Sequence, residues 1–137
     1  MTIAALLLAS LTLHVTGNAT RTTSSHCGFV ITAHVVEGGT QVTCLTSVRG
    51  YPAPGATIHS AGTMTFRSKG GTIRSRISVT QRFAANGSTA RQTLTGRIVG
   101  GTRAYRGVRG TITGGGTVVD TETRLSHLRL TYRLVFR

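Results

Sequence analysis

The stretch Gly96-Arg97-Ile98-Val99-Gly100-Gly101-Thr102-Arg103-Ala104-Tyr105-Arg106-Gly107-Val108-Arg109-Gly110 decides the fold class of this chain. It contains the end of one alternating segment, a glycine-rich turn with a single tyrosine, and the start of a second segment. Glycine tolerates the positive φ angles and close backbone approaches of tight turns. Two alternating segments joined by such a turn are typical of antiparallel strands, so the stretch indicates an all-β fold.

The same alternation extends along most of the chain, and long helical periodicity is absent. Apolar side chains at Ile73, Ile77, Val79 and Phe83 share one face, and arginine and threonine occupy the other. This period-two pattern indicates strands with one buried and one solvated face. It predicts strands near residues 29–37, 41–49, 63–68, 72–84, 89–99, 110–119 and 123–137, separated by glycine-rich turns and one loop containing prolines at 50–55.

Seven or eight antiparallel strands of this length predict an eight-stranded barrel, because closure removes the exposed sheet edges. A two-sheet β-sandwich is the alternative that the pattern leaves open. In a barrel, eight arginines fall on the outer wall, namely Arg74, Arg76, Arg82, Arg91, Arg97, Arg129, Arg133 and Arg137. This placement argues against an anionic ligand inside the barrel.

The N-terminal segment differs from the rest in composition. Ile3 to Val15 is mostly apolar and precedes the small residues Gly17-Asn18-Ala19, which predicts a signal peptide over residues 1–19 and a secreted protein. Residues 20–28 are then an N-terminal linker, and 29–137 form the barrel domain. No Lys or Arg precedes the apolar run, so a buried N-terminal strand or helix is the alternative.

Cys27 and Cys44 are the only cysteines, and export favours a disulfide between them. A hairpin turning at Gly38-Gly39 would place Cys44 opposite about Ala33 rather than Cys27. The bridge therefore requires the segment before Phe29 to fold back over the second strand. Two free buried thiols are the alternative.

Few side chains can carry chemistry. The acids are Glu37, Asp120 and Glu122, and the five histidines lack metal-ligand spacing, so we expect no metal site. No catalytic residue is identified. Five polar residues have the same parity as inward apolar neighbours, namely Thr46, Ser75, Gln81, Gln92 and Tyr132. Buried polar groups need partners, so these are candidate ligand contacts. The alternative is that they meet water at the barrel mouths.

The net charge of +13 favours partners that are anionic, such as a cell-surface polymer. The alternative is that the charge serves solubility alone, because the arginines are spread along the chain. Only seven Phe and Tyr exist, and most have inward parity, so the base-stacking platform of a nucleic-acid-binding protein is not expected.

The glycine-rich turn also resembles that of the allene oxide cyclase and dirigent barrels and of related small secreted bacterial proteins. Seven residues carry the resemblance, namely Gly100, Gly101, Thr102, Tyr105, Gly107, Arg109 and Gly110. The better-matching region runs from Ser88 to Thr121. The usual glycine after Thr102 is Arg103 here, which predicts either strain at a positive φ or a locally rebuilt turn. The usual alanine before the arginine is Val108.

The resemblance implies a calycin-like antiparallel barrel with an apolar cavity, no cofactor and often a homo-oligomeric state. Tyr105 and Arg109 would have structural roles, and no catalytic residue of the family can be placed on this chain. The leading hypothesis is a secreted barrel that binds a small hydrophobic molecule. One alternative is a cofactor-free isomerase or cyclase of this family, and another is an interaction protein for an anionic cell-surface polymer.

Overall fold

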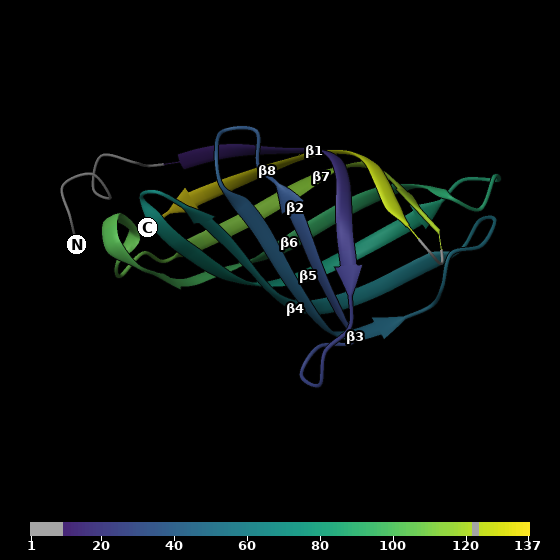
Figure 1. Cartoon of the computed structure of the whole chain (residues 1–137), viewed down its shortest axis with the longest axis horizontal. Helices are drawn as coiled ribbons and strands as arrows, with labels where there is room; N and C mark the ends of the chain where they lie inside the picture. The colour runs from purple at the N-terminus through teal and green to yellow at the C-terminus, as the bar shows by residue number, and fades with distance from the viewer. Residues whose placement is uncertain (1–9, 122–123) are drawn as a thin grey trace.

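The structure is a closed barrel of eight antiparallel strands that follow one another in chain order (Figure 1). The computed structural model describes residues 10–121 and 124–137. The strands are β1 (Ser10–Thr22), β2 (Phe29–His34), β3 (Thr40–Arg49), β4 (Thr57–Ser68), β5 (Gly71–Phe83), β6 (Thr89–Gly101), β7 (Gly110–Asp120) and β8 (Leu125–Phe136). A short 3-10 helix, η1 (Arg103–Tyr105), lies between β6 and β7. Among residues 10–121 and 124–137, no helix is both long and apolar enough to cross a membrane.

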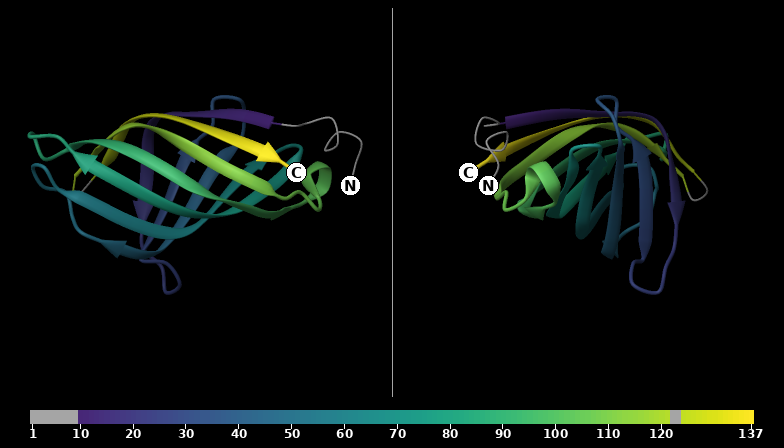
Figure 2. Two further views of the ribbon diagram at one scale, coloured as in Figure 1. Left: turned by 180° about the vertical axis from the view of Figure 1, so that it is seen from behind. Right: turned by 60° about the vertical axis from the view of Figure 1, so that its left-hand side comes forward.

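The predicted fold class is confirmed, and the barrel replaces the sandwich alternative because β8 pairs with β1. Figure 2 shows the strands wrapping around a common interior, with η1 and the C-terminus at the same end. Seven of the strands overlap the seven predicted segments, although β4 begins earlier than expected, at Thr57. The eight arginines predicted on the outer wall are all exposed.

The barrel begins before residue 29, where the sequence placed its start, because it includes β1. β1 pairs with β8 from Ser10 opposite Val135 to Ala19 opposite Leu125, and its last residues pair with β2. Leu13 and Val15 lie in the core. The barrel therefore includes residues of the predicted leader and linker. The apolar alternation of β1 resembles the apolar region of a leader, which explains the assignment. Residues 1–9 of that leader lie outside the described residues.

Three contacts hold β1 against the β2–β3 hairpin. The backbone N–H of His14 donates to Oε1 of Glu37 at 2.6 Å, and the His14 ring nitrogen Nδ1 lies 2.7 Å from Oε2. The backbone N–H of Val36 donates to the His14 carbonyl oxygen at 2.8 Å. The hydrogen bond from the His14 backbone lowers the pKa of Glu37. Glu37 thus fixes the hairpin to β1 beyond the short β1–β2 ladder.

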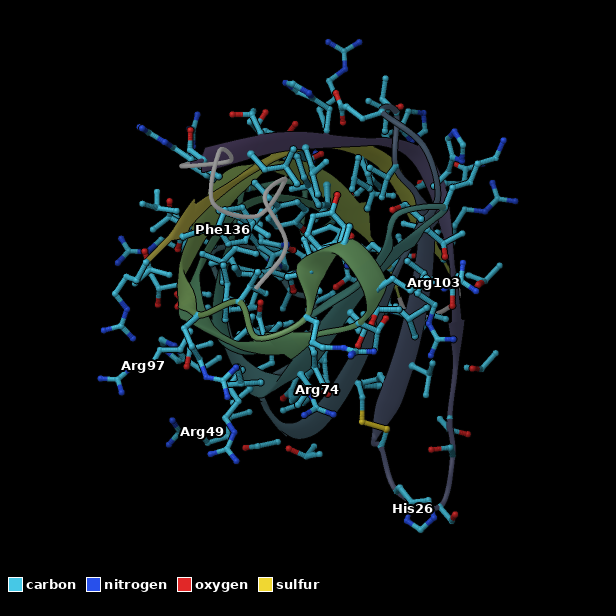
Figure 3. The ribbon with its side chains drawn as sticks, turned by 90° about the vertical axis from the view of Figure 1, so that its left-hand side faces the viewer. His26, Arg49, Arg74, Arg97, Arg103 and Phe136 are labelled. Carbon is cyan, nitrogen blue, oxygen red and sulfur yellow. A yellow bond between two sulfur atoms is a disulfide. The ribbon has the colours of Figure 1, made fainter. Side chains whose placement is uncertain are left out.

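The predicted disulfide is present, with the Cα atoms of Cys27 and Cys44 5.4 Å apart. The predicted pairing of Cys44 with Ala33 is wrong. Residues 35–39 form the turn, so Cys44 lies opposite Val30. The backbone N–H of Gly28 donates to the Leu45 carbonyl oxygen at 2.8 Å, which brings Cys27 back towards β3 as the bridge requires. The bond is visible at the lower right of Figure 3.

The barrel interior is divided by two aromatic rings. Phe66 and Tyr132 meet edge to face, with ring centroids 5.7 Å apart. On the η1 side of these rings core side chains such as Ile98, Ile112 and Leu134 pack together and leave a smaller space of about 160 Å³ beside Phe66 and Tyr105. On the other side the side chains leave a larger and mostly apolar cavity.

Candidate functional site

The candidate site is a cavity of about 270 Å³ inside the barrel. It lies at the end formed by the 50–56 loop and the turn that follows β7, opposite η1 (Figure 1). Its wall is mostly apolar and includes Ile31, Leu45, Ile58, Val79, Leu94 and Leu130. A concave apolar space with a few polar groups is the usual form of a small-molecule site.

Tyr132 lies at the inner end of the cavity and is buried. It stands opposite Gly114 on β7, and a Cβ atom at that position would overlap the tyrosine ring. Gly114 therefore makes room for the ring, which explains a glycine in a strand interior. Burial raises the pKa of Tyr132, so its hydroxyl stays protonated at neutral pH. This predicted site residue does line the cavity.

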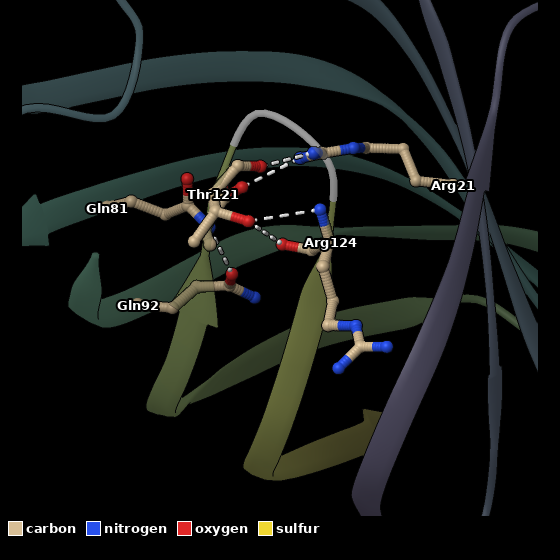
Figure 4. A network of polar contacts seen from close by, with 6 residues as sticks. Arg21, Gln81, Gln92, Thr121 and Arg124 are labelled. Carbon is tan, nitrogen blue, oxygen red and sulfur yellow. Dashed lines mark hydrogen bonds and ion pairs between the residues drawn. The ribbon is translucent and has the colours of Figure 1, made fainter.

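Gln81 and Gln92 are paired across β5 and β6. Nε2 of Gln81 donates to Oε1 of Gln92 at 3.2 Å, and both side chains line the cavity (Figure 4). Each amide keeps one polar group outside this bond. The sequence therefore identified two residues that the structure brings together in one wall.

An ion pair at the mouth of the cavity was missed by the sequence analysis. Nη1 of Arg21 donates to Oδ1 of Asp120 at 2.7 Å, and Nη2 donates to the Thr121 carbonyl oxygen (Figure 4). The Arg21 guanidinium also stacks over Phe29, 5.5 Å from the ring centroid. Arg21 was assigned to a linker, and the two ends of the chain meet only when the barrel closes. Local patterns carry no signal for such a contact.

Thr46 is a wrong prediction, because its side chain is exposed. A β-bulge between Leu45 and Ser47 leaves Thr46 unpaired in the ladder and shifts the parity of β3. Gln41 and Thr43 occupy the buried face instead, and Nε2 of Gln41 donates to Oγ1 of Thr43 at 2.6 Å. These two cavity residues were missed because both faces of β3 carry apolar residues, so the inward parity was ambiguous.

Ser75 points inward as predicted, but it belongs to the packed core and does not line the cavity. The reason is that the cavity occupies only one half of the interior. Its Oγ has no hydrogen-bond partner among residues 10–121 and 124–137. The alternative that the inward polar residues meet water at the barrel mouths also fails for Ser75, because its side chain is fully buried.

The residues of the glycine-rich turn lie at the opposite end of the barrel from the cavity. Tyr105 is half-buried against the core, and the Val108 N–H donates to its carbonyl oxygen at 3.2 Å. Gly107 has a φ of 78°. Gly100 lies beneath the Arg109 side chain, and a Cβ atom on Gly101 would overlap Tyr105. Gly110 begins β7. The turn therefore positions strands and contributes nothing to the cavity wall.

The electrostatics of the cavity favour an uncharged occupant. Asp120 at the mouth is neutralised by Arg21, and the remaining polar groups that line the wall are amides, hydroxyls and backbone. Burying an unpaired charge against an apolar wall is costly, whereas a ligand hydroxyl or carbonyl can pair with the free amide groups.

No protein-family model, no curated protein and no solved structure matches the chain.

Proposed function

We propose that the protein binds a small, uncharged and largely apolar molecule inside the barrel without a cofactor. The observation that carries this proposal is the cavity of about 270 Å³, which is larger than the space of about 160 Å³ at the η1 end and is lined mostly by apolar side chains. Protein interiors are close-packed, and a void loses contacts that a ligand could restore. The free amide groups of Gln81 and Gln92 would orient a hydroxyl or carbonyl of the ligand.

A cofactor-free isomerase or cyclase is the alternative that uses the same cavity. Such an enzyme would hold a reactive apolar molecule in one conformation while a ring closes. The resemblance of the turn to allene oxide cyclase and dirigent barrels supports this alternative, as does the protonated hydroxyl of Tyr132 at the inner end of the cavity. Binding is the leading proposal because Asp120, the one carboxylate that lines the wall among residues 10–121 and 124–137, is already held by Arg21 in an ion pair at the mouth.

We also propose that the protein works outside the cytoplasm. The Cys27–Cys44 disulfide supports this location, because such bonds persist in oxidising compartments.

Filling the cavity tests the binding proposal. We expect Val79→Phe to lower the affinity for an uncharged fluorescent probe such as Nile red by about tenfold or more, because the larger ring occupies ligand space. The matched control is Val135→Phe, which makes the same change on the outer wall. Native mass spectrometry of wild-type protein from its producing culture would then identify any retained ligand by its mass.

Two results would contradict the proposal. One is equal probe affinity in wild type, Val79→Phe and Val135→Phe, which would place the probe outside the cavity. The other is probe binding that disappears at high salt, because a buried apolar site is insensitive to screening.

A further inference from the structure

The barrel has one strongly basic half. Strands β5 to β8 carry seven arginines, all exposed, namely Arg74, Arg76, Arg82, Arg91, Arg97, Arg129 and Arg133. Strands β1 to β4 carry three, and one of these, Arg21, is paired with Asp120. The arginines are spread along the chain, but the chain-order topology gathers them on adjacent strands. Solubility alone does not require this asymmetry.

Several of these arginines face one another without an acid between them. Arg76 stands opposite Arg97, and Arg82 stands opposite Arg91, across the β5–β6 seam. Like charges in directly opposed positions destabilise a sheet. The ion pairs among the described residues use Glu37 and Asp120, so no described carboxylate compensates the seam. An external anion would relieve the repulsion.

A hollow on the outer wall lies at the η1 end of this seam. Three arginines line it, Arg67, Arg74 and Arg109, together with hydroxyl and glycine groups. Arg74 stands between Thr65 on β4 and Gly100 on β6. A bulge leaves Val99 without a partner on β5, beside the Arg74–Gly100 pair. Figure 3 shows Arg74 and Arg97 on the outside of the barrel.

The Arg109 guanidinium completes the hollow from the turn before β7. Its Nη1 donates to the Val108 carbonyl oxygen at 2.9 Å. The same nitrogen lies close to Gly100, where an added Cβ atom would be 3.6 Å from it. The glycine therefore provides a floor without a side chain beneath the guanidinium. Guanidinium groups bind tetrahedral and planar oxyanions through paired N–H donors. The hollow offers three such groups to one anion.

We propose that this hollow is an oxyanion site that anchors a linear phosphate-type polymer along the outer β5–β6 seam. From Arg74 to Arg82 the seam is ~26 Å long, at the usual rise of a strand. The wall is convex, so a flexible chain can follow it, whereas a flat bilayer would contact only part of it. The one aromatic residue of β5 and β6, Phe83, is buried, so the polymer is recognised through its oxyanions and not by base stacking.

Paired substitutions with equal loss of charge test this proposal. Long-chain inorganic polyphosphate is titrated into wild type and the variants at about 0.15 M salt, where the Debye length is about 8 Å. We expect Arg74→Gln with Arg109→Gln to weaken binding by about tenfold or more. We expect Arg129→Gln with Arg133→Gln, on β8, to weaken it by about twofold or less, because these arginines lie off the seam.

A second double variant in the hollow controls for misfolding. Arg109 bonds to the Val108 carbonyl, so its loss could disturb the turn. Arg67→Gln with Arg74→Gln leaves this bond intact and is expected to weaken binding to the same extent. Thermal unfolding of each variant establishes that it is folded before binding is compared.

Three results would overturn the proposal. Equal losses of polyphosphate affinity in the hollow variants and the β8 variant would show attraction by net charge alone. Orthophosphate that binds as tightly as the polymer would exclude a linear ligand. Vesicles of anionic lipid that bind more tightly than polyphosphate would indicate a membrane surface instead. None of these results bears on the cavity, which lies on the inner side of the wall.

Discussion

Arg103 adopts the left-handed backbone region, with a φ of 53°. The sequence left open whether the turn would be strained at this position or rebuilt. The structure keeps the positive φ and accepts a side chain there. Its carbonyl oxygen still receives the N–H of Arg106 at 3.1 Å, and Thr102 receives that of Tyr105 at 3.0 Å. Strain at one residue is therefore tolerated to preserve the turn.

Relieving this strain is expected to stabilise the protein. We expect Arg103→Gly to raise the free energy of unfolding by about 0.5–1 kcal/mol, because removal of the left-handed penalty exceeds the extra chain entropy of glycine. Arg106→Gly is the matched control, with the same loss of charge at a φ of −59°, and we expect it to lower stability. Urea unfolding of the three proteins measures both effects. Equal stability of the two variants would contradict strain at Arg103.

At the scale of elements, β1 decides whether the barrel closes. It pairs with β8 along most of its length and with β2 at its end, and Glu37 fixes it to the neighbouring hairpin. Without it, β8 and β2 would expose unpaired backbone edges, which promote aggregation. Cleavage after Ala19, as predicted from the leader-like composition, would remove ten of the thirteen residues of β1, Ser10 to Ala19.

The role of β1 can be measured with two shortened chains. We expect a chain that begins at Thr20 to lose cooperative unfolding, because it lacks Leu13, Val15 and the pairing with β8. Each buried aliphatic side chain contributes about 1.5–3 kcal/mol, which is a large part of a small domain's stability. The control chain begins at Ser10 and is expected to unfold cooperatively by calorimetry. A cooperative transition in the shorter chain would show that β1 is dispensable.

At the scale of the whole molecule, the barrel places its apolar cavity inside and its basic charge on the outer wall. The larger interior cavity lies at the end away from η1, while the outer wall carries seven exposed arginines on β5–β8 and two, Arg49 and Arg67, on β1–β4. Opposed arginines such as Arg76 and Arg97 repel one another across the wall. The free energy of unfolding should therefore rise with ionic strength, because salt screens the repulsion between the arginines. If ion pairs dominated, salt would lower it.

We expect the melting temperature to rise with sodium chloride. Between 0.01 M and 0.15 M salt the Debye length falls from about 30 Å to about 8 Å, which screens most of the repulsion. A gain of ~1 kcal/mol would raise the melting temperature by roughly 3–6 °C for a chain of this size. Arg76→Thr with Arg82→Thr, which removes one arginine of each opposed pair, should show a smaller rise. A melting temperature that falls with salt would show that ion pairs dominate.

The sequence by itself determined the strands and the outward and inward faces of most of them. Strict alternation along β5, β6 and β8 placed the arginines outside and Gln81, Gln92 and Tyr132 inside, because side-chain direction in a strand depends only on parity. Where a bulge interrupts a strand, parity fails, and Thr46 was misplaced for that reason. The disulfide followed from the presence of only two cysteines.

Only the tertiary structure decided the contacts that depend on closure. Arg21 and Asp120 meet because β1 returns to β8, although 99 positions separate them in the chain. The cavity, the packed core around Ser75 and the gathering of arginines on adjacent strands depend on the same closure. Periodicity is a local property set by the backbone, whereas these features depend on which distant strands become neighbours, and no short segment encodes that choice.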